Sequence, residues 1–82
     1  MDHLIADQIA EIVKRVLKLP SDTFINSDIN LFTKGLDSLK MIEMIVDLEA
    51  AFKIEFNDDD LQGKNFSSID AITQMMQAVY KV

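Results

Sequence analysis

The stretch DSLKMIEMIVDLEAAFK, residues 37–53, decides the architecture expected for this chain. Asp37 and Ser38 both carry side chains that accept hydrogen bonds from the free N–H groups of a first turn. A helix is therefore predicted to begin at one of them and to run to about residue 53. With about 100° between successive residues, its apolar side chains separate into two groups. The first group follows i, i+3, i+4, i+7 and i+11, which is typical of a core stripe: Met41, Met44, Ile45, Leu48 and Phe52.

A second apolar group lies on the far side of the same helix: Leu39, Ile42 and Val46. Charged residues are interleaved with it, namely Lys40, Glu43, Asp47 and Glu49. Because one small bundle buries only one face of a helix, the second group is interpreted as a partner-docking surface inside a charged rim. The alternative is a helix sandwiched in the middle of the bundle, which would bury Glu43 and Asp47 beside apolar residues without partners.

A further amphipathic helix is predicted over residues 4–17. Its apolar residues share one helical face: Ile5, Ile9, Ile12, Val13, Val16 and Leu17. Leu19-Pro20 ends the helix, and residues 20–35 are interpreted as a long loop. Five apolar residues are expected to pin this loop to the core: Phe24, Ile25, Ile29, Leu31 and Phe32. A loop of this length is uncommon in a compact domain and is usually functional.

Towards the C-terminus, residues 57–63 are expected to form one short helical turn and residues 67–81 a last helix. Ser67-Ser68-Ile69-Asp70 resembles a capping box at the start of that helix. Its buried stripe is predicted to comprise Ile69, Ile72, Met76, Val79 and Tyr80. The expected fold is therefore all-α, a small four-helix bundle with three longer helices and one short one, in a single domain over residues 1–82.

Composition and charge exclude several classes of function. The 82 residues include no Cys, so neither a disulfide framework nor a thiolate metal site is expected, and the chain is predicted to be cytoplasmic. No apolar run approaches the ~20 residues that a bilayer needs, so we expect no membrane partner. Of the formal net charge of -6, five negative charges lie in residues 37–82. This charge disfavours nucleic acid as a ligand and favours basic protein partners; a monomer is expected.

Ser38 admits three interpretations. A catalytic nucleophile needs a general base within reach, and the only histidine, His3, lies near the N-terminus, so an enzyme is not expected. Asp37 and Ser38 taken alone are most often a helix cap. The third interpretation is a modification site, because the positive end of a helix favours a phosphodiester on Ser38. No metal site is expected, since the acids of residues 58–60 are consecutive and lack the spacing of a calcium-binding loop.

The stretch Gly35-Leu36-Asp37-Ser38-Leu39 and the acidic helix after it resemble the phosphopantetheine attachment motif of acyl carrier proteins. The resemblance extends to the N-terminal amphipathic helix, to the loop that closes with residues 31–34, and to residues 48–52 and 54–58. It implies that a phosphopantetheinyl transferase loads a covalent 4'-phosphopantetheine from coenzyme A onto Ser38, flanked by Asp37 and Leu39. An acyl or aminoacyl group would then be carried as a thioester.

The resemblance also implies partners. Acyl-loading and acyl-processing enzymes with basic docking surfaces would meet the chain at the positions that match the family's contacts, which are Asp37, Leu39, Ile42, Glu43 and Val46. Asp47 is assigned to the same partner-binding surface as Ile42, Glu43 and Val46. In carriers of the fatty-acid type the acyl chain folds between the helices, and a pocket for it would be lined by Met41, Met44, Ile45, Leu48, Phe52, Ile69 and Ile72.

Three positions depart from the pattern of fatty-acid carriers. Lys40 stands where an acid is common, Leu36 is more reminiscent of polyketide or other specialised carriers, and Asn57 replaces a frequent proline. The departures leave open a carrier for fatty-acid, polyketide or related specialised biosynthesis. They also leave open an aminoacyl or peptidyl carrier of the same fold, and an unmodified helical protein-interaction module.

Overall fold

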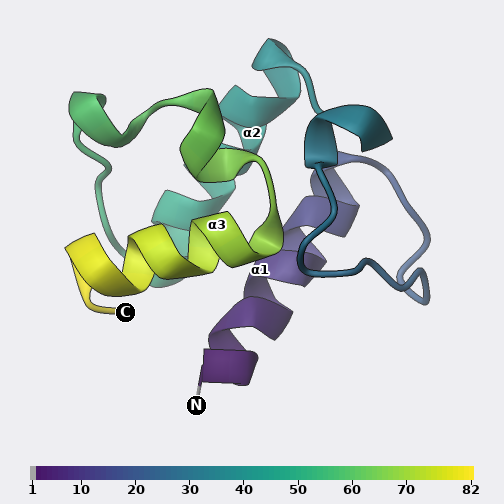
Figure 1. Ribbon diagram of the computed structural model, residues 1–82, viewed down its shortest axis with the longest axis horizontal. Coiled ribbons are helices and arrows are strands. Elements are labelled where there is room, and N and C mark those ends of the chain that lie inside the picture. The colour runs from purple at the N-terminus through teal and green to yellow at the C-terminus, as the bar shows by residue number, and fades with distance from the viewer. Residues whose placement is uncertain (1) are drawn as a thin grey trace.

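The computed structural model describes the backbone of residues 2–82 and the side chains of residues 5–82. The side chains of His3 and Leu4, which figured in the sequence predictions, lie outside the described residues. The described part is all-helical (Figure 1), which confirms the predicted fold class. Its elements, in chain order, are α1 (Asp2–Val16), the 3-10 turn η1 (Leu31–Lys34), α2 (Ser38–Phe52), the 3-10 turns η2 (Asp58–Asp60) and η3 (Gly63–Phe66), α3 (Ile69–Met75) and the π-helical turn η4 (Met76–Tyr80).

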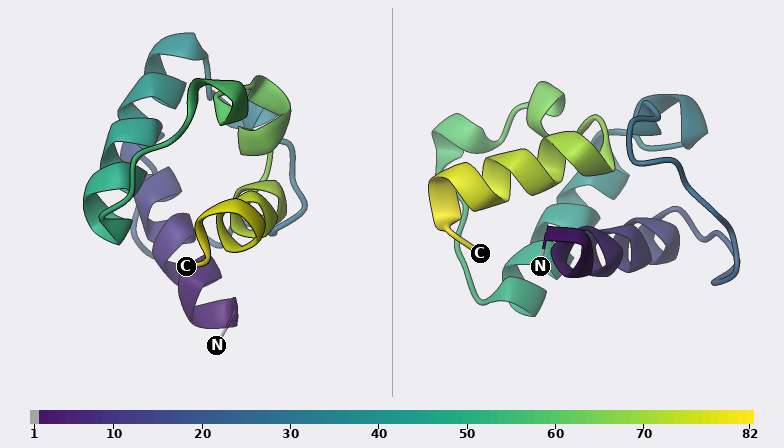
Figure 2. Two further views of the ribbon diagram at one scale, coloured as in Figure 1. Left: turned by 90° about the vertical axis from the view of Figure 1, so that its left-hand side faces the viewer. Right: turned by 60° about the horizontal axis from the view of Figure 1, so that its bottom comes forward.

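The three α-helices enclose one apolar core. α1 contacts both α2 and α3, and Figure 2 shows the segment with η2 and η3 arching from the end of α2 to the start of α3. The side chains that are most completely buried come from every long helix and from the turns: Phe66, Ile9, Leu31, Met44, Leu48, Ile72, Met76 and Val13. Both buried members of α2, Met44 and Leu48, belong to the predicted core stripe, which is therefore confirmed.

α1 ends at the predicted place for a local reason. Lys18 adopts the left-handed conformation at φ 59, which turns the chain away from the helix axis. The N–H of Leu19 then bonds the carbonyl of Lys14 at 2.8 Å, and that of Leu17 bonds the carbonyl of Val13 at 2.9 Å. These bonds satisfy carbonyl groups in the last turn of the helix, which have no partner within it, before Pro20 begins the loop.

The loop after α1 is pinned to the rest of the molecule at fewer points than the sequence predicted. Leu31 is buried, and Ile25 and Ile29 are half-buried, but Phe24 is 82% exposed. Main-chain bonds from Leu31 N to Ser67 O and from Asp70 N to Ser27 O attach the loop to the start of α3. The prediction that Phe24 anchors the loop was wrong, because these backbone bonds fix the path of the chain without it.

The segment between α2 and α3 contains two 3-10 turns, where the sequence predicted one short helical turn. Phe56, which precedes η2, is buried, and its N–H bonds Glu49 Oε2 at 2.9 Å. Its ring meets those of Phe66 and Tyr80 edge-on, with centroids 5.6 and 5.2 Å away. These edge-to-face contacts connect the arching segment to the core and to the end of the last helix.

The start and the end of the last helix both differ from the prediction. Ser68, rather than Ser67, is the N-cap, since its Oγ accepts from Ala71 N at 3.0 Å, so Asp70 is not in the capping-box position. The π-helical turn places more residues in one turn than an α-helix does, which moves the side chains after Met76 around the axis. As a result Val79 is 47% exposed and is not a member of the buried stripe. Among the described helices, none is long and apolar enough to cross a membrane.

The two faces of α2 predict opposite responses to truncation. Leu48→Ala removes a side chain that is 0% exposed and is expected to lower the free energy of unfolding by about 2–5 kcal/mol. Val46→Ala, on the exposed side of the same helix, is expected to change it by about 0.5 kcal/mol or less. Urea unfolding followed by circular dichroism measures both, and equal losses would contradict the assignment of the two faces.

Candidate functional site

Ser38 is the first residue of α2 and is held in place by the three residues before it. Gly35 closes η1 in the left-handed conformation at φ 108, where any other residue would be strained. Leu36 then turns inward, is only 4% exposed, and donates its N–H to the carbonyl of Leu31 at 3.1 Å. This anchoring positions Asp37 and Ser38 at the surface, immediately beside the core.

Asp37 supplies the helix cap. Its Oδ1 accepts from Lys40 N at 2.8 Å, and its carbonyl accepts from Met41 N at 2.8 Å. The sequence left open whether Asp37 or Ser38 caps the helix, and the structure assigns the role to Asp37. Ser38 is exposed, so its hydroxyl is accessible and is not part of the cap.

The start of α2 fits a phosphodiester on that hydroxyl. The N–H groups of Ser38 and Leu39 lie in the first turn and have no acceptor inside the helix. They lie at the positive end of the helix dipole, where an anion is stabilised. An exposed hydroxyl at such a position can therefore hold a covalently attached phosphate arm without displacing any buried side chain.

The second apolar group of α2 faces outward. Leu39, Ile42 and Val46 are 69%, 56% and 56% exposed, which rules out a helix sandwiched in the middle of the bundle. Glu43 is also exposed. We call these four residues, Leu39, Ile42, Glu43 and Val46, the outer face of α2.

The structure pairs Asp47 with a side chain of α1. Its Oδ2 lies 3.8 Å from Arg15 Nη2 on α1, an ion pair that no local sequence pattern predicts because the partners are far apart along the chain. Glu49 is directed elsewhere as well, since it accepts the N–H of Phe56. The solvent-exposed ion pair between Asp47 and Arg15 contributes little to stability. It does, however, partly neutralise one acid of the rim predicted around the docking surface.

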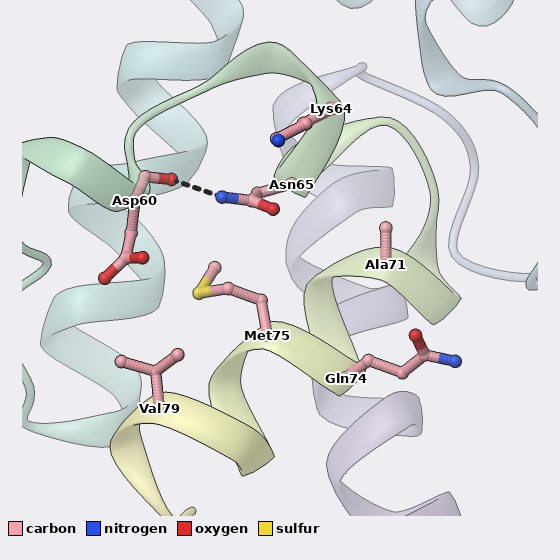
Figure 3. A pocket seen from close by; sticks show the side chains of 7 residues that line it. All are labelled: Asp60, Lys64, Asn65, Ala71, Gln74, Met75 and Val79. Atoms are coloured by element: carbon pink, nitrogen blue, oxygen red, sulfur yellow. Dashed lines mark hydrogen bonds between the residues drawn. The ribbon is translucent and has the colours of Figure 1, made fainter.

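The predicted acyl pocket between the helices is not supported by the hollows described in the structure. Met44, Leu48 and Ile72 are completely buried in the packed core. A hollow of about 440 Å³ lies instead between the η2–η3 segment and α3 (Figure 3), and its lining includes Asn65, whose Nδ2 donates to the carbonyl of Asp60 at 2.9 Å. It is open and contains no residue of α2, so it is not part of the Ser38 site.

One acid of η2, Asp60, has a structural partner. Tyr80 donates its hydroxyl to Asp60 Oδ2 at 2.7 Å and accepts the N–H of Asn57 at 2.7 Å. Burial raises the pKa of Tyr80, and the hydrogen bond to Asp60 raises it further, whereas the Asn57 N–H acts in the opposite direction. In the described part of the chain, no three His, Cys, Asp or Glu side chains are grouped closely enough to hold a metal ion.

Comparison with known proteins identifies the class. The family model of the phosphopantetheine attachment site matches residues 7–76. The chain therefore belongs to this family of acyl carrier-type proteins, whose members carry a covalently attached 4'-phosphopantetheine and are not themselves catalytic.

Curated relatives agree with this assignment. The chain is 36% identical over 73 residues to an aminoacyl carrier protein of Agrobacterium fabrum, with 87% of each chain covered. It is 29% identical over 73 residues to the chloroplastic acyl carrier protein 1 of Spinacia oleracea, covering 89% of this chain and 51% of the relative. The corresponding protein of Casuarina glauca is 32% identical over 56 residues, which cover 68% of this chain and 41% of the relative. The chain thus spans about half or less of the two chloroplastic relatives.

The cap gives a first test of the site. Asp37→Ala removes the acceptor for Lys40 N and is expected to lower the free energy of unfolding by about 1 kcal/mol. Asp37→Asn keeps an acceptor oxygen and is expected to retain most of the stability. Asp22→Ala, an exposed acid of the loop, is the matched control and should leave the denaturation midpoint unchanged. If Asp37→Ala behaved like the control, Asp37 would not be the cap.

Proposed function

We propose that this chain carries acyl intermediates as thioesters on a 4'-phosphopantetheine arm attached to Ser38, in fatty-acid, polyketide or related specialised biosynthesis. The observation that carries the proposal is the exposed Ser38 hydroxyl at the start of α2, with the cap supplied by its neighbour Asp37. A serine that is not needed for the cap can be modified without loss of the helix start. Family membership supports the arm, and the geometry supports the residue.

In this proposal the chain is a substrate of its partners and not an enzyme. A phosphopantetheinyl transferase supplies the base that takes the proton of the Ser38 hydroxyl. The Ser38 oxygen bonds to the phosphorus next to the pantetheine of coenzyme A, and the nucleotide leaves. The first turn of α2 then stabilises the phosphodiester with its N–H groups. The arm supplies a terminal thiol for the thioester.

An aminoacyl cargo is the second candidate. The Agrobacterium relative is an aminoacyl carrier protein, and the alignment with it covers 87% of both chains. Lys40, which stands where fatty-acid carriers commonly have an acid, agrees with a partner set different from theirs.

The attachment site is tested by intact mass. The purified chain is incubated with coenzyme A and a broad-specificity phosphopantetheinyl transferase. Wild type is expected to gain the mass of one phosphopantetheine, whereas Ser38→Ala is expected to gain none. Ser21→Ala, which removes another exposed hydroxyl, should gain the arm as wild type does. No gain by wild type with several transferases would favour an unmodified interaction module instead.

We propose further that partner enzymes with basic docking surfaces bind the outer face of α2 together with Asp47. The apolar residues Leu39, Ile42 and Val46 would supply the buried centre of such an interface, and Glu43 a charged contact at its rim. Because Asp47 is paired with Arg15, Glu43 is expected to contribute more than Asp47 does.

The docking proposal predicts loss of coupling without loss of stability. Glu43→Lys or Val46→Asp is expected to lower the kcat/KM of the transferase for the chain by about tenfold or more, which is about 1.4 kcal/mol of binding. Both changes lie at exposed positions, so the free energy of unfolding should fall by about 1 kcal/mol or less. Glu55→Lys makes the same charge change outside the outer face and serves as the control. A large stability loss in both variants would show that these residues belong to the core.

A further inference from the structure

Phe24 is the most exposed large apolar side chain in the described part of the chain, at 82%. It lies in the loop that joins α1 to η1, which stands away from the helices at one side of the molecule (Figure 1). Backbone bonds fix the path of this loop, so the ring is not needed to hold the loop in place. Exposed aromatic side chains are typical anchors of protein interfaces.

Two hollows flank the ring. Residues 23–25 line both of them, so this segment is the ridge between the two. The first, which we call the apolar hollow, has a volume of about 280 Å³ and a mainly apolar lining that includes Leu19, Ile29 and Leu31. The second has a volume of about 310 Å³ and lies between the ridge and α1. Both volumes are near the lower end of the range of about 300–1,000 Å³ for ligand pockets, so each suits single side chains of a protein.

The second hollow is acidic. Asp7 and Glu11 are exposed and lie about one turn apart on the part of α1 that lines it. The cation among its described lining residues, Lys14, is already engaged, since its Nζ lies 2.9 Å from Glu11 Oε2 and donates to Ser21 O at 2.8 Å. Asp22, which precedes the ridge, is a further exposed acid. A cation brought by a partner would therefore meet a net negative charge here.

The ridge keeps its shape through bonds that do not involve the ring. Thr23 N bonds Pro20 O at 3.0 Å, which closes the turn before Phe24. The bond from Lys14 Nζ to Ser21 O connects the same turn to α1. A surface that is organised before binding loses less conformational entropy on association. The ring and the two hollows are thus arranged to receive a partner.

We propose that the Phe24 ridge and its two hollows bind a basic segment of a partner protein, in which an arginine lies next to an apolar side chain. The apolar side chain fills the apolar hollow. The guanidinium stacks on the Phe24 ring and pairs with Asp7 and Glu11 in the acidic hollow. This surface contains no residue of α2 and needs no arm on Ser38, so the binding is independent of the proposed function.

Charge decides between this partner and a second copy of the chain. In a symmetric contact through this surface, each copy would bring the same three acids to the other: Asp7, Glu11 and Asp22. Each copy also carries a formal net charge of -6. Like charges in such a contact repel, most strongly at low salt. A basic segment brings the opposite sign and is therefore the better fit.

The test titrates the unmodified full chain with a short capped peptide in which arginine and leucine alternate, and follows the amide signals by NMR. The signals of Thr23, Phe24 and Ile25 are expected to move until they saturate, and the affinity is expected to fall as salt is added. A peptide with glutamate in place of arginine should not bind. A peptide with serine in place of leucine should bind about fivefold more weakly or worse. Ser38→Ala, which cannot accept an arm, should bind as wild type does.

Matched variants assign the binding to this surface. Phe24→Ala is expected to weaken binding at the loop signals by about tenfold, whereas Ile42→Ala truncates an exposed apolar residue of the outer face of α2 and should leave it unchanged. Asp7→Lys is expected to weaken it by a similar factor. Asp58→Lys makes the same charge change at an exposed position outside both hollows and should weaken it by about twofold or less. All four positions are exposed, and circular dichroism checks that each variant folds.

Several outcomes would overturn the proposal. One is a titration in which the loop signals do not move, or in which only signals of the outer face of α2 do. Another is wild-type affinity in Phe24→Ala, and a third is equal binding of the glutamate peptide. Self-association of the free chain, with loop signals that shift as its concentration rises, would identify a second copy as the occupant instead. None of these measurements requires transfer of the arm, so failure here and failure of the proposed function are distinguishable.

Discussion

Burial of a single face of α2 is the constraint on which the rest of this molecule depends. Met44 and Leu48 lie in the core that α2 forms with α1 and α3, and in the part of the chain that the structure describes no further layer covers the opposite side of α2. Leu39, Ile42 and Val46 are consequently exposed, although their side chains are as apolar as those of the core. An exposed apolar face of this kind plays no structural role in the isolated chain. The free energy of burying it is therefore available for contact with a partner.

The start of α2 shows how the same helix provides a position for chemistry. Gly35 reverses the chain, Leu36 anchors it in the core, and Asp37 caps the first turn. The next residue, Ser38, is thereby fixed in position but carries no structural duty. Under the proposed function, this division of roles would allow Ser38 to be modified without loss of the helix, since the cap and the hydroxyl are different side chains.

Much of the site could be predicted from sequence because the deciding patterns are local. Helical spacing separated the two faces of α2, and the Asp37-Ser38 pair marked its start. Two local predictions failed within the last helix. Ser68 displaced Ser67 as the cap of α3, and the π-helical turn after Met75 turned Val79 towards solvent. In both cases the predicted and the observed positions differ by one residue along the helix. A single sequence does not resolve a difference of that size.

The sequence by itself determined that the chain is helical, that α2 has two apolar faces, and that Ser38 stands at a helix start, since each property follows from spacing along one segment. Only the tertiary structure decided whether the second face of α2 is covered, which side chain pairs with Asp47, and where space remains beneath the surface. The pairing of Arg15 with Asp47 joins residues that are distant in the chain. Such proximities arise from the packing of several elements at once, so no local pattern encodes them.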